Sequence, residues 1–214
     1  MKYKLIIFDM DGTILYTLED LTDCMNYALT ENGLPERTMA EVKSFVGNGI
    51  RKLVERAVPE NTDKKTVDNT YESFKKRYRN FCNVKTKPYD GINELILELK
   101  KKGYLTAVVS NKADFAVQDL CKDYFPGLFD CAIGDREDIR KKPYPDGVEL
   151  ALKTLGVAKE DAVYVGDSDV DFNTAKNANM DLIMVDWGFR ERDYLESLGA
   201  TRFISKPEDI YKYI

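Results

Sequence analysis

The sequence predicts an α/β fold in which helices cover both faces of a parallel sheet, with an all-helical domain inserted after the first strand. Three observations support this prediction. Short apolar runs recur along the chain, as in strands that are buried on both faces. Helical periodicity separates most of these runs, and such alternation favours a parallel sheet. The alternation breaks once, because residues 17–82 show helical periodicity and no convincing strand.

The predicted strands are short runs that are almost continuously apolar. They cover residues 5–8, 105–109, 131–133, 162–165, 182–185 and 203–204. A strand with one wet face alternates polar and apolar residues, and most of these runs do not. We therefore expect them to form the interior of a sheet with both faces covered.

Helices of the sheet domain are predicted where apolar residues recur at i, i+3, i+4 and i+7. This spacing relates Ile92, Leu95, Ile96 and Leu99, and it also relates Val148, Ala151, Leu152 and Leu155. Asp146 with Glu149 resembles a capping box that opens the second of these helices.

The inserted domain is predicted from three apolar stripes at helical spacing. They consist of Leu18, Leu21, Met25 and Ala28, then Ile50, Leu53, Val54, Ala57 and Val58, then Val67, Tyr71, Phe74, Tyr78 and Phe81. No strand pattern interrupts them. We place the inserted helical domain at residues 16–82 and the sheet domain at residues 1–15 and 83–214.

The composition excludes several classes of protein. The chain has 214 residues, of which 43% are hydrophobic, and a net charge of -5, so it lacks the general basic character of a nucleic-acid binder. No stretch is long and apolar enough to cross a bilayer or to act as an export signal. The four cysteines are scattered without a CxxC pair, as in a reduced protein. We expect a cytoplasmic protein with no nucleic-acid or membrane partner.

The sequence contains no histidine. This absence excludes Ser-His-Asp and Cys-His catalysis and histidine-bearing zinc or iron sites. A metal must then be held mainly by oxygen ligands, which favours Mg²⁺. Proton transfer must depend on carboxylates, Lys, Tyr, Cys or water.

Polar residues follow three of the predicted strands. Asp9 and Asp11 follow the first, Ser110 and Asn111 the second, and Asp167 follows the strand at 162–165. In an open parallel sheet the carboxyl ends of the strands share one edge, where ligands bind. Two ionised acids at the end of a buried strand repel each other, which destabilises the fold. A divalent cation between these acids and a ligand would remove this repulsion. The alternative is a solvated turn, which Asp and Gly also favour.

Lys142 lies in a loop that Pro143 and Pro145 stiffen just before a predicted helix. A fixed ammonium there suits an anion. Each polar residue also has a structural alternative. Ser110 is suited to cap the next helix, Lys142 to be a solvated lysine, and Asp171 to close a variant capping box with Ser168.

Four segments together resemble the motifs of the haloacid dehalogenase-like superfamily, in the same order along the chain. They are Asp9-x-Asp11-Gly12-Thr13, Ser110-Asn111, Lys142-Pro143 and Gly166-Asp167-Ser168-x-x-Asp171. Further segments, such as Ser110-Asn111-Lys112 and Asp186-Trp187-Gly188-Phe189-Arg190, are similar to the phosphoglycolate phosphatase branch. The resemblance implies a Rossmann-like core and a small helical cap domain after the first motif.

The resemblance also implies roles for these residues. Asp9 would attack phosphorus to give an aspartyl-phosphate, and Asp11 would protonate the leaving oxygen and then activate water. Mg²⁺ would bind Asp9, the backbone carbonyl of Asp11, and Asp167. Phosphoryl oxygens would be held by Ser110, Asn111 and Lys142. In support, Asp171 would orient Lys142 or a water at the metal, and Gly12 would form the tight turn.

The expected function is therefore Mg²⁺-dependent hydrolysis of a small phosphorylated metabolite, phosphoglycolate-like, by a monomer or homodimer. Two alternatives stay open: a phosphomutase on the same scaffold, and a non-enzymatic phosphate-responsive binding module. Substrate selectivity is expected in the cap, where Arg51 is either a substrate ligand or a surface arginine. Trp187 and Arg190 follow a predicted strand and are expected to border the site, with core packing as the alternative for Trp187.

Overall fold

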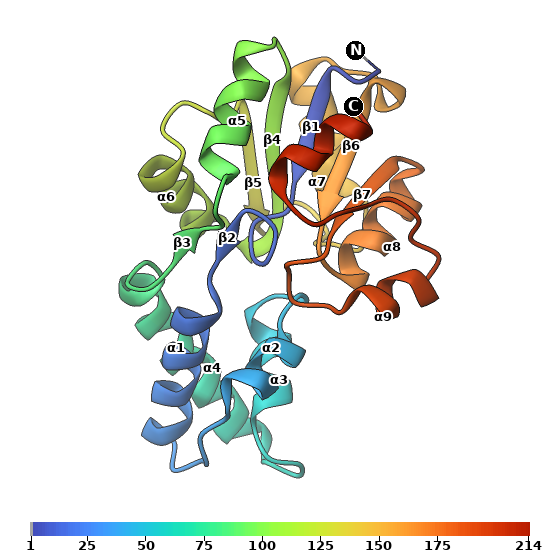
Figure 1. The fold of residues 1–214 in the computed structure, drawn as a ribbon. Helices are drawn as coiled ribbons and strands as arrows, with labels where there is room; N and C mark the ends of the chain where they lie inside the picture. Colours follow the sequence, from blue (N-terminus) through green and yellow to red (C-terminus); the bar gives the residue numbers. More distant parts are fainter. Residues whose placement is uncertain (1) are drawn as a thin grey trace. The chain divides into compact units, whose positions relative to one another are not determined.

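The computed structural model describes residues 2–214 (Figure 1). These residues divide into two compact units. The larger unit comprises residues 2–15 with Pro88–Ile214, and the smaller unit is Tyr16–Lys87.

The larger unit contains a six-stranded sheet in the order β5-β4-β1-β6-β7-β8, and every neighbouring pair is parallel. The strands are β1 (Leu5–Phe8), β4 (Leu105–Ala113), β5 (Cys131–Asp135), β6 (Ala162–Gly166), β7 (Asp181–Val185) and β8 (Phe203–Ile204). The predicted parallel α/β fold is thus confirmed. Strand β4 runs four residues further than its apolar run, so Ser110, Asn111 and Lys112 belong to the strand.

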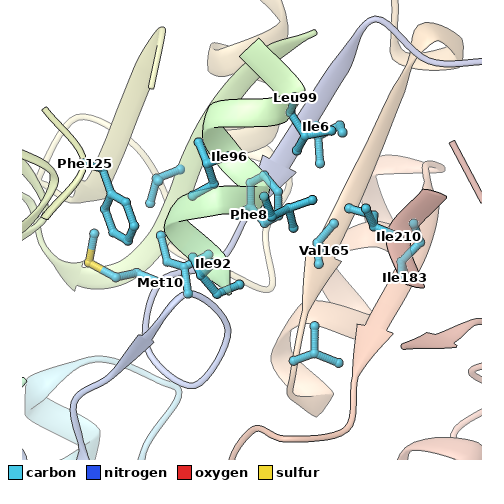
Figure 2. Packing of buried hydrophobic residues seen from close by; sticks show 14 of the residues in the cluster. Ile6, Phe8, Met10, Ile92, Ile96, Leu99, Phe125, Val165, Ile183 and Ile210 are labelled. Carbon is cyan, nitrogen blue, oxygen red and sulfur yellow. The ribbon is translucent and has the colours of Figure 1, made fainter. Parts of the chain in front are cut away.

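Helices cover both faces of this sheet, because alternate residues of each strand point to opposite faces. On β1, Ile6 and Phe8 pack against α5 (Ile92–Lys101), as Figure 2 shows. Leu5 and Ile7 belong instead to the opposite cluster. The first face is also covered by α6 (Asp114–Tyr124) and the 3₁₀-helix η2 (Pro207–Lys212), and the second by α7 (Asp146–Leu155) and α8 (Asp169–Ala178). Further along, η1 (Lys159–Asp161) precedes β6, and α9 (Arg192–Ser197) packs near β7 and β8.

The smaller unit is all-helical. Its helices are α1 (Leu18–Glu31), α2 (Met39–Phe45), α3 (Ile50–Ala57) and α4 (Lys64–Phe81). Three of them contain the predicted apolar stripes. Helix α2 was not predicted, although its start is a complete capping box between Thr38 and Glu41. The segments that connect the two units pair as β2 (Leu15–Tyr16) and β3 (Lys87–Pro88).

The second boundary of the helical unit lies after Lys87, whereas the sequence places it after Cys82. The reason is the buried carboxylate of Asp20 in α1. It accepts hydrogen bonds from the backbone N–H groups of Val84, Lys85 and Thr86, at 2.8 to 3.0 Å, and from the Thr86 hydroxyl at 2.8 Å. These bonds attach the returning chain to α1, so the helical unit includes it.

One local prediction in the sheet unit is wrong, and one structural alternative is absent. Asp146 is the first residue of α7 and makes no capping bond there, because its carboxylate pairs with the Arg140 guanidinium at 2.8 Å. Ser110 does not cap α6, whose preceding residue is Ala113. The variant capping box of Ser168 and Asp171 is present at the start of α8. Within residues 2–214, no helix is both long and apolar enough to traverse a lipid bilayer.

Candidate active site

The register of the sheet brings three polar strand ends together. Phe8 of β1 is aligned with Val108 of β4 and with Val165 of β6. Asp9 therefore leaves β1 between the ends of its two neighbours, and the backbone N–H of Asp9 still donates to the Val165 carbonyl at 2.9 Å. On the two neighbouring strands, Ser110 comes two residues after Val108, and Asp167 comes two residues after Val165. The predicted convergence at the carboxyl edge of the sheet is present.

Lys142 lies at the centre of a buried charged cluster. Its ammonium is 2.8 Å from Asp9 Oδ1 and 2.7 Å from Asp171 Oδ1. All three residues are nearly inaccessible to solvent, and Asp171 is completely buried. A buried ammonium with two carboxylate partners keeps its charge and offers a fixed positive centre beside Asp9.

Both oxygens of Asp171 are occupied within the protein. Oδ1 contacts Lys142, and Oδ2 accepts from the backbone N–H groups of Asp167 and Ser168 at 3.1 and 3.0 Å and from the Ser168 hydroxyl at 2.6 Å. These bonds connect Lys142 to the loop that contains Asp167. Asp171 therefore orients Lys142 and shapes this loop, which leaves it poorly suited to bind a metal directly.

Tyr164 completes the surroundings of Lys142, and the sequence did not indicate it. Its buried hydroxyl accepts from Lys142 at 3.0 Å and lies 3.1 Å from both the Val109 carbonyl and Asp171 Oδ1. Tyr164 looks like an ordinary apolar member of the strand at 162–165. Its hydroxyl lies beside the Lys142 ammonium because β6 pairs with β1 and because the loop that contains Lys142 returns to this strand.

Asp167 is held by two residues from distant parts of the chain. Oδ1 accepts from the Thr13 hydroxyl at 3.1 Å, and Oδ2 accepts from the Phe189 backbone N–H at 2.7 Å. Two glycines allow this close packing. A Cβ at Gly12, where φ is +86°, would lie 2.4 Å from Asp167 Oδ2, and a Cβ at Gly188 would lie 2.2 Å from Asp167 Cβ. A side chain at either position would displace the Asp167 carboxylate.

Asp11 is paired with a lysine that was not predicted as a site residue. Asp11 Oδ1 lies 2.7 Å from the Lys112 ammonium, and Lys112 is only 5% exposed. Lys112 directly follows Ser110 and Asn111, so its proximity to that motif was the available signal. Ser110 Oγ accepts from the Lys112 backbone N–H at 3.3 Å, and Asn111 Nδ2 donates to the Lys142 carbonyl at 2.9 Å.

Burial and mutual repulsion set the electrostatics of the acids. Burial, followed by repulsion from Asp171, raises the pKa of Asp9 from 3.8 to about 7. The same two causes raise the pKa of Asp167 well above its ordinary range. Burial opposes the charge on Lys142, but Asp171 and Asp9 together outweigh it, and the pKa of Lys142 lies well above its usual value.

The acidic residues fit a divalent cation. Buried carboxylate oxygens of Asp9 and Asp167 lie within 4.8 Å of each other and of Asp171, whose own oxygens are engaged by Lys142 and the 167–168 loop. Asp9 Oδ1 is buried and, although close to Lys142, lies outside hydrogen-bond geometry. Burial, followed by repulsion from Asp171, raises the pKa of both Asp9 and Asp167, so a cation beside them would stabilise their ionised forms. Oxygen donors with uncompensated charge are the donor set that Mg²⁺ prefers.

Three other residues considered in the sequence have protein partners. Arg51 pairs with Glu55 at 2.9 Å and with Asp68 at 2.7 Å, inside the helical unit. Trp187 Nε1 donates to the Thr13 carbonyl at 3.1 Å, which joins its loop to the turn after β1. Arg190 lies 3.0 Å from Asp169.

Comparisons with known proteins agree with this geometry. The model of the family described as haloacid dehalogenase-like hydrolase matches residues 6–185. The phosphoglycolate phosphatase of Aquifex aeolicus is 33% identical over 98% of this chain and 95% of its own. The N-acetylmuramic acid 6-phosphate phosphatase of Pseudomonas aeruginosa is 28% identical over 98% and 94% of the two chains.

A solved structure from Lactobacillus delbrueckii subsp. bulgaricus superposes with a TM-score of 0.94 at 40% identity, covering 99% of this chain and 98% of that one. The similarity therefore extends over both units and includes every strand of the sheet. With its parallel sheet, its acidic strand ends and the match over most of its length, the chain belongs to the haloacid dehalogenase-like hydrolase family.

Proposed function

We propose that this protein is a Mg²⁺-dependent phosphatase that hydrolyses a small phosphate monoester, phosphoglycolate-like, through an aspartyl-phosphate on Asp9. The observation that supports this most is the buried cluster in which the Lys142 ammonium lies 2.8 Å from the Asp9 carboxylate and 2.7 Å from Asp171. A carboxylate beside a fixed cation at the carboxyl edge of a parallel sheet is placed to attack an electrophilic, anionic group.

In the first step, an Asp9 oxygen forms a bond to phosphorus while the bond between phosphorus and the ester oxygen breaks. The ester oxygen keeps the electron pair and takes a proton from the Asp11 carboxyl group, so the alcohol leaves neutral. Ser110, Asn111 and Lys142 hold the phosphoryl oxygens, and the Lys142 charge stabilises them during transfer.

In the second step, water bonds to phosphorus and gives a proton to the Asp11 carboxylate. The bond between Asp9 and phosphorus breaks, which releases inorganic phosphate and restores the Asp9 carboxylate. Asp11 then holds the proton that the next cycle requires. The two steps use one nucleophile and one acid–base residue, which suits a chain without histidine.

Asp9, the backbone carbonyl of Asp11, and Asp167 would hold the Mg²⁺ ion. When bound, the ion neutralises the repulsion between the Asp9 carboxylate and an anionic phosphate ester. We also propose that the helical unit, Tyr16–Lys87, is the cap domain, in which substrate selectivity lies. Relatives named for two different substrates, phosphoglycolate and N-acetylmuramic acid 6-phosphate, make the substrate an experimental question.

The experiment is a panel of small phosphate esters, with and without Mg²⁺, assayed for free phosphate. It includes 2-phosphoglycolate, N-acetylmuramic acid 6-phosphate and a sugar monophosphate. We expect Mg²⁺-dependent release, abolished by Asp9→Asn with the fold retained. Asp161→Asn is the matched control, since Asp161 pairs with Lys4 at the opposite end of the sheet.

Wild-type phosphate release by Asp9→Asn would refute the assignment of Asp9. An isomerised sugar phosphate without free phosphate would point to a mutase instead. Uptake of phosphate from a donor, with no turnover of any ester, would point to a phosphate-responsive binding module.

A further inference from the structure

Lys112 is a buried ammonium outside the cluster around Lys142. Its side chain is 2% exposed, and its Nζ lies 2.7 Å from Asp11 Oδ1, whose side chain is 14% exposed. Removing an ammonium from water costs several kcal/mol unless a partner compensates it. The position of Lys112 is therefore coupled to that of Asp11.

The lysine and the aspartate come from two segments that lie 101 residues apart in the chain. Lys112 belongs to the end of β4, beyond the last pair with β1 at Val108 and inside the irregular stretch between Val109 and Ala113 of the pairing with β5. Its backbone N–H donates to Ser110 Oγ at 3.3 Å. Asp11 lies in the turn after β1, next to Gly12. An ion pair from β4 to this turn restricts the rotamers of the Asp11 carboxylate, so Lys112 contributes to its orientation.

The pair also distinguishes the two oxygens of Asp11. Lys112 engages Oδ1, and within residues 2–214 no hydrogen-bond donor lies against Oδ2. Oδ2 is therefore the oxygen available to hold or accept a proton. A general acid must have its proton within hydrogen-bond reach of the leaving oxygen, so the rotamer that Lys112 selects decides whether Asp11 is effective.

We infer that Lys112 is a positioning residue that orients Asp11 for proton transfer, so that it controls the hydrolysis of esters with poor leaving groups. This inference rests on the proposed phosphatase function. An alkoxide leaving group needs the proton from Asp11 as its bond to phosphorus breaks. A 4-nitrophenolate is stable without that proton. Loss of Lys112 should therefore affect alkyl esters much more than 4-nitrophenyl phosphate.

The test compares wild type and Lys112→Met on an alkyl phosphate, such as 2-phosphoglycolate, and on 4-nitrophenyl phosphate. The quantity compared is kcat/KM, which includes steps only up to phosphoryl transfer onto Asp9. We expect a fall of about 10² for the alkyl ester and less than about threefold for the aryl ester, within the range of general acid catalysis.

Asp11→Asn should show the same dependence on the leaving group. In the Asp11→Asn background, Lys112→Met should lower kcat/KM for the alkyl ester little further, because the two residues act as one unit. Lys100→Met is the matched control, since it removes an ammonium from the Lys100–Asp130 ion pair of the same unit, away from the site. If Lys112→Met does not fold, Lys112→Gln is measured instead, and a smaller effect in the same direction is expected.

Equal losses on both esters would overturn the inference, because Lys112 would then serve phosphate binding or general stability. Unchanged activity on the alkyl ester would also overturn it, as would additive losses in the double variant. Each of these results leaves the proposed phosphatase function intact. If the wild-type protein releases phosphate from neither ester, the proposed function itself fails, and the inference fails with it.

Discussion

Asp9→Asn should stabilise the metal-free protein, even though it abolishes the proposed activity. The pKa of Asp9 is raised from 3.8 to about 7, chiefly by burial and then by repulsion from Asp171. The unfolded chain loses this proton near pH 4, and the folded protein holds it to about pH 7. Between these values the unfolded state binds fewer protons, so stability falls as the pH rises.

The magnitude follows from about 1.4 kcal/mol per pH unit. The raised pKa of Asp9 lowers the free energy of unfolding by about 4 kcal/mol at pH 8, where the folded protein holds an ionised Asp9, and by about 2 kcal/mol at pH 5, where it binds a proton that the unfolded chain has lost. Asp9 is 7% exposed, so solvent screens little of this cost. Asparagine has nearly the same shape and does not ionise, and Lys142 keeps Asp171 as its partner at 2.7 Å.

The assay is urea unfolding of both proteins in EDTA at pH 5, 6, 7 and 8. The stabilisation by Asp9→Asn should grow with pH by about 3 kcal/mol and level off above pH 7. Excess Mg²⁺ should reduce the difference, since a cation that binds only the folded wild type stabilises it. Asp161→Asn, a surface change, should show no such trend between pH 5 and 8.

A stability difference between Asp9→Asn and wild type that does not vary with pH would contradict a raised pKa of Asp9. So would an Asp9→Asn variant that is less stable than wild type at pH 8 in EDTA. Either result would mean that Asp9 is hydrated or neutralised in the metal-free protein.

Three further predictions follow from single contacts. Tyr164→Phe removes the hydroxyl beside Lys142 and should lower the free energy of unfolding in urea by about 1 to 2 kcal/mol. It should reduce kcat/KM only severalfold, because Lys142 keeps both carboxylate partners. A hundredfold loss of kcat/KM would contradict this prediction. Gly188→Ala places a carbon 2.2 Å from Asp167 Cβ and should weaken Mg²⁺ binding at least about tenfold. A Mg²⁺ titration followed by the fluorescence of Trp187, the single tryptophan, measures this change. An unchanged titration midpoint would argue against Asp167 as a ligand. Asp20→Ala removes the acceptor of the Val84 and Lys85 backbone N–H groups and should lower the free energy of unfolding by about 1 to 3 kcal/mol. Hydrogen exchange at both N–H groups should become faster. Unchanged exchange would show that Asp20 does not attach this segment to α1.

The strands were predictable because their signal is local. A strand buried on both faces must be apolar at every position, and β1 has apolar residues throughout its four positions, all of them buried. The helical stripes are local in the same sense. Where several groups compete for one partner, local reasoning failed: Asp146 pairs with Arg140 instead of capping α7.

The residues that carry the proposed chemistry were named from the sequence, but most of their partners were not. Asp9, Asp167 and Lys142 follow from the motifs and from the rule that strand ends share an edge. Lys112 next to Asp11, Tyr164 next to Lys142, and the Phe189 N–H on Asp167 do not follow, because each contact joins residues far apart in the chain.

The kinds of residue and their order could be read from the chain without coordinates: apolar strands, acids and a lysine after them, no histidine, and a helical insertion. Which carboxylate oxygen faces which ammonium depends on the three-dimensional fold. Chain spacing defines where a strand ends, but the direction of a side chain depends on sheet register and on segments that return from 100 or more residues away, as β4 brings Lys112 to Asp11.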